Sequence, residues 1–188
     1  QEIEYKIETF KDNIINGKKE AIEEYCSLLL EYSAYPIEYD KNIILTCNQD
    51  LLVIDYSFPS VDTFPSLVEM KFTKGKCVPV QMTEKVFSKH YDDALYQITL
   101  RSIYEIFADK YLSFVNSVAF NGWVSALNKA NSKIETNCIL SIKTNREQIT
   151  DIDFMNVSPK ACFKSLKGVA SSQLYTITAI QPIVALNR

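Results

Sequence analysis

The sequence predicts a mixed α/β protein, and three observations lead to this prediction. Two amphipathic helical stretches come first, short β-rich runs follow, and one long helical stretch separates these runs from further strands. The chain has 188 residues, of which 47% are hydrophobic and 23% charged. This is the composition of a globular domain with a full core. We therefore expect one α/β domain preceded by a helical segment.

The first two elements are predicted helices at residues 2–15 and 18–33. Asn16-Gly17 is expected to separate them. Apolar residues recur at helical spacing in both, namely Ile3, Ile7, Phe10 and Ile14, then Ile22, Tyr25, Cys26, Leu29 and Leu30.

Pro36 is expected to stop the second helix. We therefore divide the chain into two parts. Residues 1–35 form an N-terminal helical segment that packs on or precedes the core, and residues 36–188 form the main domain.

The period then changes from helical to extended. Residues 43–45 and 51–54 are short β-rich runs joined by a turn, and residues 57–66 hold two prolines and three serines, which favour a loop. Residues 67–72 are a further predicted strand, which Lys74-Gly75-Lys76 is expected to end.

The second half begins with the longest helical stretch, at residues 83–111. The elements expected after it are strands at 114–127 and 138–143 joined by a polar hairpin at 128–133, a short helix at 158–167 with Gly168 at its end, and a last β-like run at 176–184.

Composition excludes several classes of protein. The net charge of −3 argues against a non-specific nucleic-acid coat protein. Five cysteines without a CxxC pair argue against a disulfide framework or a zinc ribbon and indicate reduced thiols in a cytoplasmic protein. Because His90 is the single histidine, a bound metal would rest on carboxylates, which favours Mg²⁺ or Mn²⁺.

Targeting signals are not expected either. No apolar run approaches the ~18 residues of a membrane helix. The polar start, Gln1-Glu2-Ile3-Glu4, lacks the features of a signal peptide. We expect no membrane partner.

Three residues form the strongest candidate for chemistry. Asp55 ends the apolar run 51–55, and Glu69 and Lys71 alternate within the strand 67–72. Because strand side chains alternate, Glu69 and Lys71 share one face, and Asp55 reaches that face if its strand is the neighbour, as the order of the runs suggests. Two carboxylates would hold a divalent cation that activates water, and the ammonium would stabilise the pentavalent transition state of phosphodiester hydrolysis.

The spacing of Asp55, thirteen residues, and Glu69-x-Lys71 resembles the signature of the PD-(D/E)xK nuclease superfamily. Further stretches are similar to a bacterial branch of restriction endonucleases, over roughly residues 40–183: Tyr96 to Arg101, Phe120 to Trp123, and Pro159 to Lys164. The resemblance implies a restriction-endonuclease-like α/β/α core with a central mixed β-sheet and N-terminal helices.

The resemblance also implies roles for single residues. Asp55 and Glu69 would bind Mg²⁺ (or Mn²⁺) with the backbone carbonyl of Met70, Lys71 would be the catalytic lysine, and Gln97 on the long helix would join the catalytic site. Ile54 stands where the family has proline. An acidic residue of the first core helix is the remaining open assignment, with four candidates: Glu20, Glu23, Glu24 and Glu31.

Basic residues are candidates for nucleic-acid contacts. Arg101 lies on a polar stripe of the long helix that also holds Gln97, and a second cluster comprises Lys160, Lys164 and Lys167. A solvated helix face is the alternative for both sets.

The function implied is that of a Mg²⁺-dependent endodeoxyribonuclease that cleaves DNA in bacterial defence against foreign DNA. Fold alone does not fix function, so two alternatives stay open. One is a catalytically silent module of the same fold that serves in DNA binding or protein assembly. The other is an assembly module whose N-terminal helices dimerise or dock on a partner. A homodimer or a larger protein assembly is an expected partner state.

Overall fold

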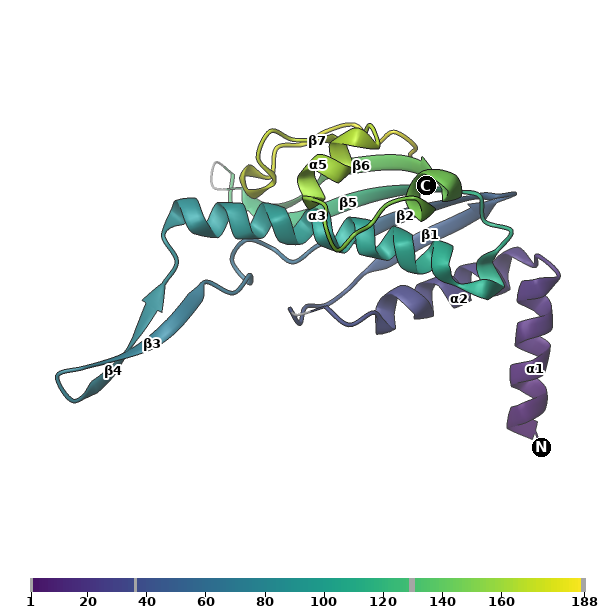
Figure 1. The fold of residues 1–188 in the computed structure, drawn as a ribbon, viewed down its shortest axis with the longest axis horizontal. Coiled ribbons are helices and arrows are strands. Elements are labelled where there is room, and N and C mark those ends of the chain that lie inside the picture. Colours follow the sequence, from purple (N-terminus) through teal and green to yellow (C-terminus); the bar gives the residue numbers. More distant parts are fainter. Residues whose placement is uncertain (1, 36, 129–130, 187–188) are drawn as a thin grey trace.

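A mixed five-stranded sheet forms the centre of the molecule in the computed structural model (Figure 1), which describes residues 2–35, 37–128 and 131–186. The predicted helix stop at Pro36 and the middle of the predicted hairpin at 128–133 lie outside the described residues. The strand order is β1-β2-β5-β6-β7. The bounds are β1 Ile43–Asn48, β2 Leu51–Ser57, β5 Ser117–Asn128, β6 Lys133–Asn145 and β7 Val169–Ala170.

The sheet is mixed because of one connection. β2 pairs antiparallel with β1 and parallel with β5, while β5, β6 and β7 pair antiparallel in sequence order. A parallel pair needs a crossover, and the long helix α3, Glu84–Ala108, supplies it. The mixed α/β class with a central mixed sheet is thereby confirmed.

The helices that cover the sheet contact one another and form a single layer (Figure 1). Their bounds are α2 Lys19–Tyr32, α3 Glu84–Ala108, α4 Arg146–Thr150 and α5 Pro159–Ser165, with short 3₁₀ turns at Lys110–Leu112 and Leu174–Thr176. The second helical layer of the expected α/β/α arrangement is not found among the described residues. None of the helices in that part of the chain combines the length and apolar character needed to cross a membrane.

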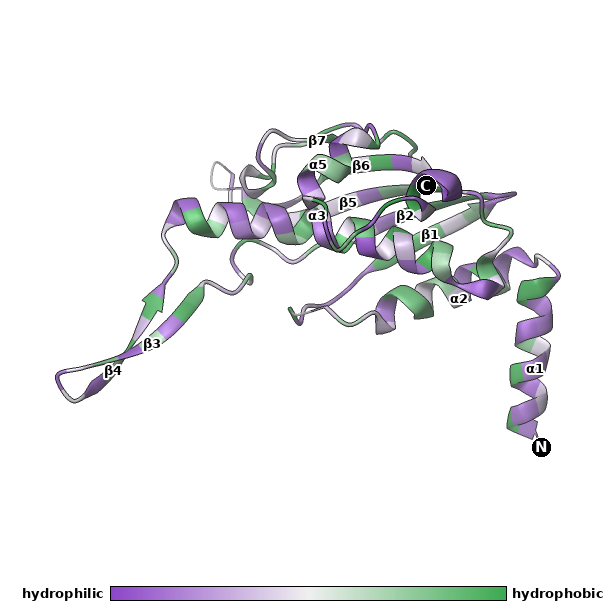
Figure 2. Cartoon of the chain, in the orientation of Figure 1, coloured by the Kyte–Doolittle hydropathy of each residue, from purple (hydrophilic) through white to green (hydrophobic). Residues whose placement is uncertain are grey.

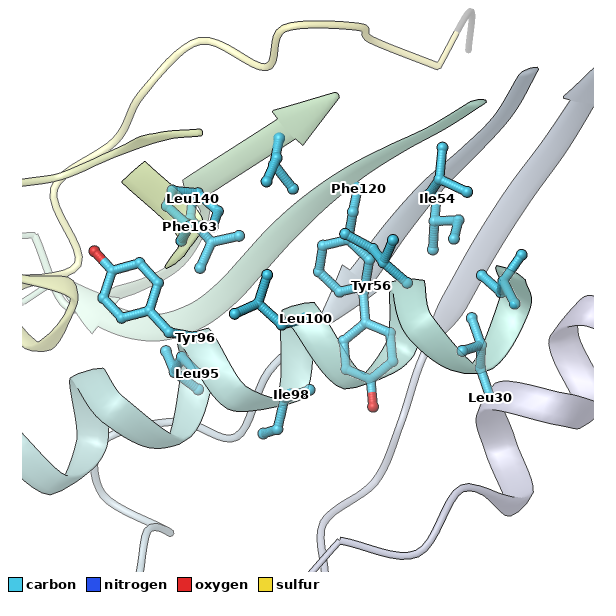
Figure 3. Close-up of a cluster of buried hydrophobic side chains, with 14 of the residues drawn as sticks. Leu30, Ile54, Tyr56, Leu95, Tyr96, Ile98, Leu100, Phe120, Leu140 and Phe163 are labelled. Atoms are coloured by element: carbon cyan, nitrogen blue, oxygen red, sulfur yellow. The ribbon is translucent and has the colours of Figure 1, made fainter. Parts of the chain in front are cut away.

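The main core lies between the sheet and this helical layer (Figure 3). Tyr56 and Phe120 stack at a ring-centroid distance of 5.3 Å, and neither side chain is exposed. Phe58 packs on both rings. A Cβ at Gly122 would approach the Phe58 ring to 2.0 Å, so this strand position requires glycine.

The N-terminal helices join this core unequally. Ile22, Cys26 and Leu30 of α2 are buried in the main core. The end of α2 is held by Lys41, whose ammonium donates to the carbonyls of Leu30, Glu31 and Ser33 at 2.5–3.2 Å. Helix α1, Glu2–Ile15, is mostly exposed and buries only Ile14 fully.

A second, two-stranded sheet projects from the body (Figure 1). It comprises β3, Leu67–Thr73, and β4, Lys76–Gln81, and we call residues 67–81 the arm. Lys74 and Gly75 form the two-residue turn with φ of 50° and 76°, the positive values that tight hairpin turns require. Lys74-Gly75-Lys76 was expected only to end the strand 67–72, and β4 was not predicted.

The C-terminal segment, residues 177–186, is not the β-strand expected at 176–184. Ile177 adopts a left-handed conformation with φ of 53°, and Pro182 has no backbone N–H for a ladder. The segment instead crosses the sheet face opposite the helices, where the backbone N–H of Ile180 donates to the carbonyl of Cys138 at 2.8 Å. Isolated hydrogen bonds replace regular strand pairing.

Candidate functional sites

Asp55 belongs to a row of polar side chains that crosses the centre of the main sheet. The strand register places Asp55 beside Asn121, and Asn121 beside Ser141. The Asn121 amide donates to the Asp55 carboxylate at 2.9 Å, and the Ser141 hydroxyl donates to the Asn121 carbonyl oxygen at 2.7 Å. All three are buried. We call Asp55, Asn121 and Ser141 the polar row.

The polar row binds the C-terminal segment. The Asn121 amide also donates to the carbonyl of Val184 at 2.8 Å, and the backbone N–H of Ile183 donates to the Ser141 hydroxyl at 2.9 Å. Hydrogen-bonding groups that are buried in a sheet require such partners. These bonds give the row a structural role, because they fix an irregular segment on the sheet.

A groove of about 1040 Å³ lies beside the polar row on the same sheet face. Its lining combines Asp55 with Lys19, Trp123 and Val184, among other residues of β1, β2 and β5. The C-terminal segment forms part of the groove wall through Val184 and the two residues after it.

Glu69 and Lys71 lie on the arm and not beside Asp55. Their side chains pair with each other at 3.1 Å, and both are more than half exposed. The expectation that the strand 67–72 neighbours the strand of Asp55 is wrong, because β2 pairs with β1 and β5 while β3 pairs with β4. The chain leaves the sheet after Ser57, and β5 takes the place beside β2.

The residues proposed to hold Mg²⁺ do not fit a common ion. Asp55 is buried in the central sheet, whereas Glu69 and Met70 are on the arm. Among the described residues, no group of three or more His, Cys, Asp or Glu side chains is placed to hold a metal. A hard cation needs several oxygen ligands at one point.

Of the four acidic candidates on α2, Glu23 is the one that contacts the sheet edge. Its carboxylate accepts from the Thr46 hydroxyl and from the backbone N–H of Cys47, both at 2.9 Å. Lys19 lies 3.7 Å from the same oxygen. The Glu23 carboxylate therefore provides an acceptor for hydrogen-bond donors of the outer strand β1.

Gln97 and Arg101 lie on the outer side of α3, away from the polar row. With Tyr104 they line a groove of about 670 Å³ whose opposite wall is the loop 152–157. Arg101 donates to Glu105 at 2.8 Å and lies over the Tyr35 ring, so its charge is already paired. The four predicted catalytic residues thus occupy three separate places.

The basic cluster predicted near residue 160 is partly engaged. The Lys160 ammonium lies 5.9 Å from the centre of the Tyr96 ring and close to Asp92, whereas Lys164 and Lys167 are exposed. Lys164 on α5 and Lys167 in the turn after it make a small basic area. Its contact with nucleic acid stays a prediction.

The arm has two unlike faces. Strand alternation predicts that Glu69 and Lys71 share a face of β3, but β4 and the projection of the hairpin from the body were not predicted. The register sets Met70 opposite Pro79 and Phe72 opposite Cys77, so these four side chains form one apolar face. Every residue of β3 is exposed, with Phe72 at 75%. Figure 2 shows hydrophobic stretches on both strands of the arm. The opposite face carries the charged pair Glu69 and Lys71.

The polar row was also missed. Its sequence signal was weak, since Asn121 and Ser141 are single polar residues inside apolar strands. Only the register, with its one irregularity after Gly122, brings them next to Asp55.

No protein-family model, curated protein or solved structure matches this chain.

Proposed function

We propose that this chain is a module of protein assembly without hydrolytic activity, and that the arm is its docking element. One observation carries this proposal: the arm projects from the body with an apolar face on which nothing packs among the described residues. Contiguous exposed apolar side chains mark interaction surfaces.

The physics of hairpins supports the proposal. A two-stranded hairpin is marginally stable in water and gains stability from a third strand or from a helix packed on its face. Within the part of the chain that the structure describes, the arm has neither, and Met70 is 56% and Phe72 75% exposed. A docking partner would bury these side chains and order the arm.

Hydrolysis of DNA with Mg²⁺, and a role in defence against foreign DNA, stay predictions from sequence. They require Asp55, Glu69 and Lys71 at one point, whereas Asp55 lies in the main sheet and the other two lie on the arm. Asp55 has a ready structural role in the polar row. These positions favour the assembly module over the enzyme.

A protein partner suits the arm better than DNA. The arm carries three lysines and one glutamate, and a two-stranded ribbon does fit the major groove. However, Met70, Phe72, Cys77 and Pro79 make one whole face apolar. Protein surfaces that bind DNA are polar and positively charged, so this apolar face would find no complementary surface on DNA.

The test of catalysis uses supercoiled plasmid with Mg²⁺ and with Mn²⁺. We expect no cleavage by the wild-type chain. Cleavage that disappears in Lys71→Ala would overturn the proposal and support the nuclease hypothesis instead.

The test of partner class uses a duplex of about 30 base pairs in a gel-shift titration, where each phosphate contact steepens the salt dependence. We expect no shift near physiological salt that depends on the arm. A shift that the double variant Lys74→Glu, Lys76→Glu abolishes, and that Lys164→Glu does not, would make the arm a DNA-binding element.

A further inference from the structure

We infer that the partner of the arm is a second copy of this chain, whose helix α1 packs on the apolar face of the arm. The inference rests on the proposed docking role of the arm. It names the docked surface as well: the stripe on α1 that comprises Ile3, Ile7, Phe10 and Ile14.

Only half of this stripe is used within one chain. Ile14 is 1% exposed and Phe10 packs on Tyr25 of α2, so the second half of α1 is held against the body. Ile3 and Ile7 continue the same stripe, but they are 74% and 49% exposed. The helix therefore presents the apolar surface that a hairpin needs, and the arm presents the apolar surface that an amphipathic helix needs.

The two surfaces are complementary in charge. Helix α1 carries four acidic and two basic residues, whereas the arm carries one acidic and three basic residues. The exposed first half of α1, residues 2–9, spans about 12 Å and fits within the about 23 Å of the seven residues of β3. Opposite net charges favour this pairing over arm with arm or α1 with α1, both of which bring like charges together.

The positions of α1 and the arm allow a closed pair. They lie at opposite ends of the molecule and project to the same side of the body (Figure 1). A two-fold rotation exchanges the ends, so each arm reaches the α1 of the other copy. Two equal contacts then form in one closed dimer, and each contact raises the effective concentration for the other.

The test measures solution mass by sedimentation velocity from about 1 to 200 µM, because self-association depends on concentration. We expect a wild-type dimer. Phe72→Glu on the arm and Ile7→Glu on α1 should each raise the dimer dissociation constant at least about tenfold, since both reciprocal contacts lose an apolar side chain. Two matched controls, Val78→Glu on the other face of the arm and Thr9→Glu on the other face of α1, should leave it nearly unchanged.

A mixing experiment tests the pairing itself. Equal amounts of Phe72→Glu and Ile7→Glu chains retain one intact arm and one intact α1, which belong to different copies. We expect the mixture to form heterodimers when neither variant associates alone. Pairing of arm with arm, or of α1 with α1, gives no such rescue.

Three results would overturn the inference: a wild-type monomer over the whole range, an Ile7→Glu chain that associates like wild type, or a mixture that stays monomeric. Circular dichroism of each variant checks that the fold is retained. The proposed function fails separately, through cleavage that depends on Lys71 or a DNA shift that depends on the arm.

Discussion

Two of the antiparallel hairpins, β5–β6 and the arm, have opposite surroundings. The hairpin β5–β6 has long strands whose central residues are almost all buried, whereas no residue of β3 and none of β4 is buried. Both contain apolar residues, and both have a register irregularity. What separates them is their neighbours: β5 has β2 on its other side and α3 over its face, whereas no described residue adds a third strand or a helix to the arm.

This comparison teaches that apolar content does not by itself place a strand in a core. The side chains of β5 gain stability from burial inside the molecule. Those of the arm can gain it only from another molecule. Substitutions in the hairpin β5–β6 should therefore change the stability of the fold, and substitutions in the arm should change association.

The largest effect on stability is expected from Phe120→Ala in β5. Phe120 is fully buried and stacks on Tyr56, so its removal should lower the free energy of unfolding by about 3–5 kcal/mol. Urea unfolding followed by circular dichroism measures the change. Phe120→Leu, which keeps much of the volume, should cost clearly less; equal costs would mean that filling the volume without the aromatic ring restores no stability.

The second largest effect on stability is expected from Asn121→Ala in the polar row. The substitution removes two donated bonds, to Asp55 and to Val184, and the acceptor of the Ser141 hydroxyl. We expect a loss of about 2–3 kcal/mol in unfolding free energy. Amides of the C-terminal segment should also exchange hydrogen faster.

The matched control for the polar row is Ser125→Ala, an exposed position on the same strand. It should change stability by no more than about 0.5 kcal/mol. If Asn121→Ala is as mild as this control, the row does not hold the segment.

A smaller, pH-dependent effect is expected from Asp92→Asn in α3. Burial raises the pKa of Asp92 above its ordinary value of 3.8, although backbone N–H groups of Tyr175 and Leu174 oppose the shift. The folded state then binds the proton more tightly than the unfolded state, so this group lowers stability as pH rises from about 3.8 through the raised pKa.

Asparagine does not titrate and still offers an oxygen to the Tyr175 N–H, which Asp92 accepts at 3.0 Å. The stability of Asp92→Asn relative to wild type should therefore increase over that pH window and level off above it. Thermal unfolding at a series of pH values measures the difference. A difference that is independent of pH contradicts the expected shift.

The smallest effect on monomer stability is expected from Phe72→Ala in the arm. Because Phe72 is 75% exposed, the unfolding free energy of the monomer at low concentration should change by at most about 0.5 kcal/mol. Association at high concentration should weaken. A large loss of stability in dilute solution would mean that the arm folds back on its own body.

The residues of the candidate site show what the alternation of side chains along a single strand can predict. The alternation of strand residues correctly predicted that Glu69 and Lys71 share a face, and they form an ion pair. The same reasoning placed Asp55 beside them only through an assumed pairing of consecutive strands. That pairing failed because the chain forms the arm after Ser57, while the crossover through α3 brings β5 next to β2.

The sequence by itself determined the helices and strands whose formation depends on residues close together in the chain. The predicted helices and most strands appear within a few residues of their expected bounds, because helical spacing, β-rich runs and turn residues act over short distances. The strand expected at 176–184 failed, because a strand exists only when a neighbour pairs with it. The tertiary structure alone decided which strands are neighbours, that Asp55 meets Asn121 and Ser141, and that the apolar residues of the arm stay uncovered. These are long-range contacts, and their free energies depend on residues far apart in the chain.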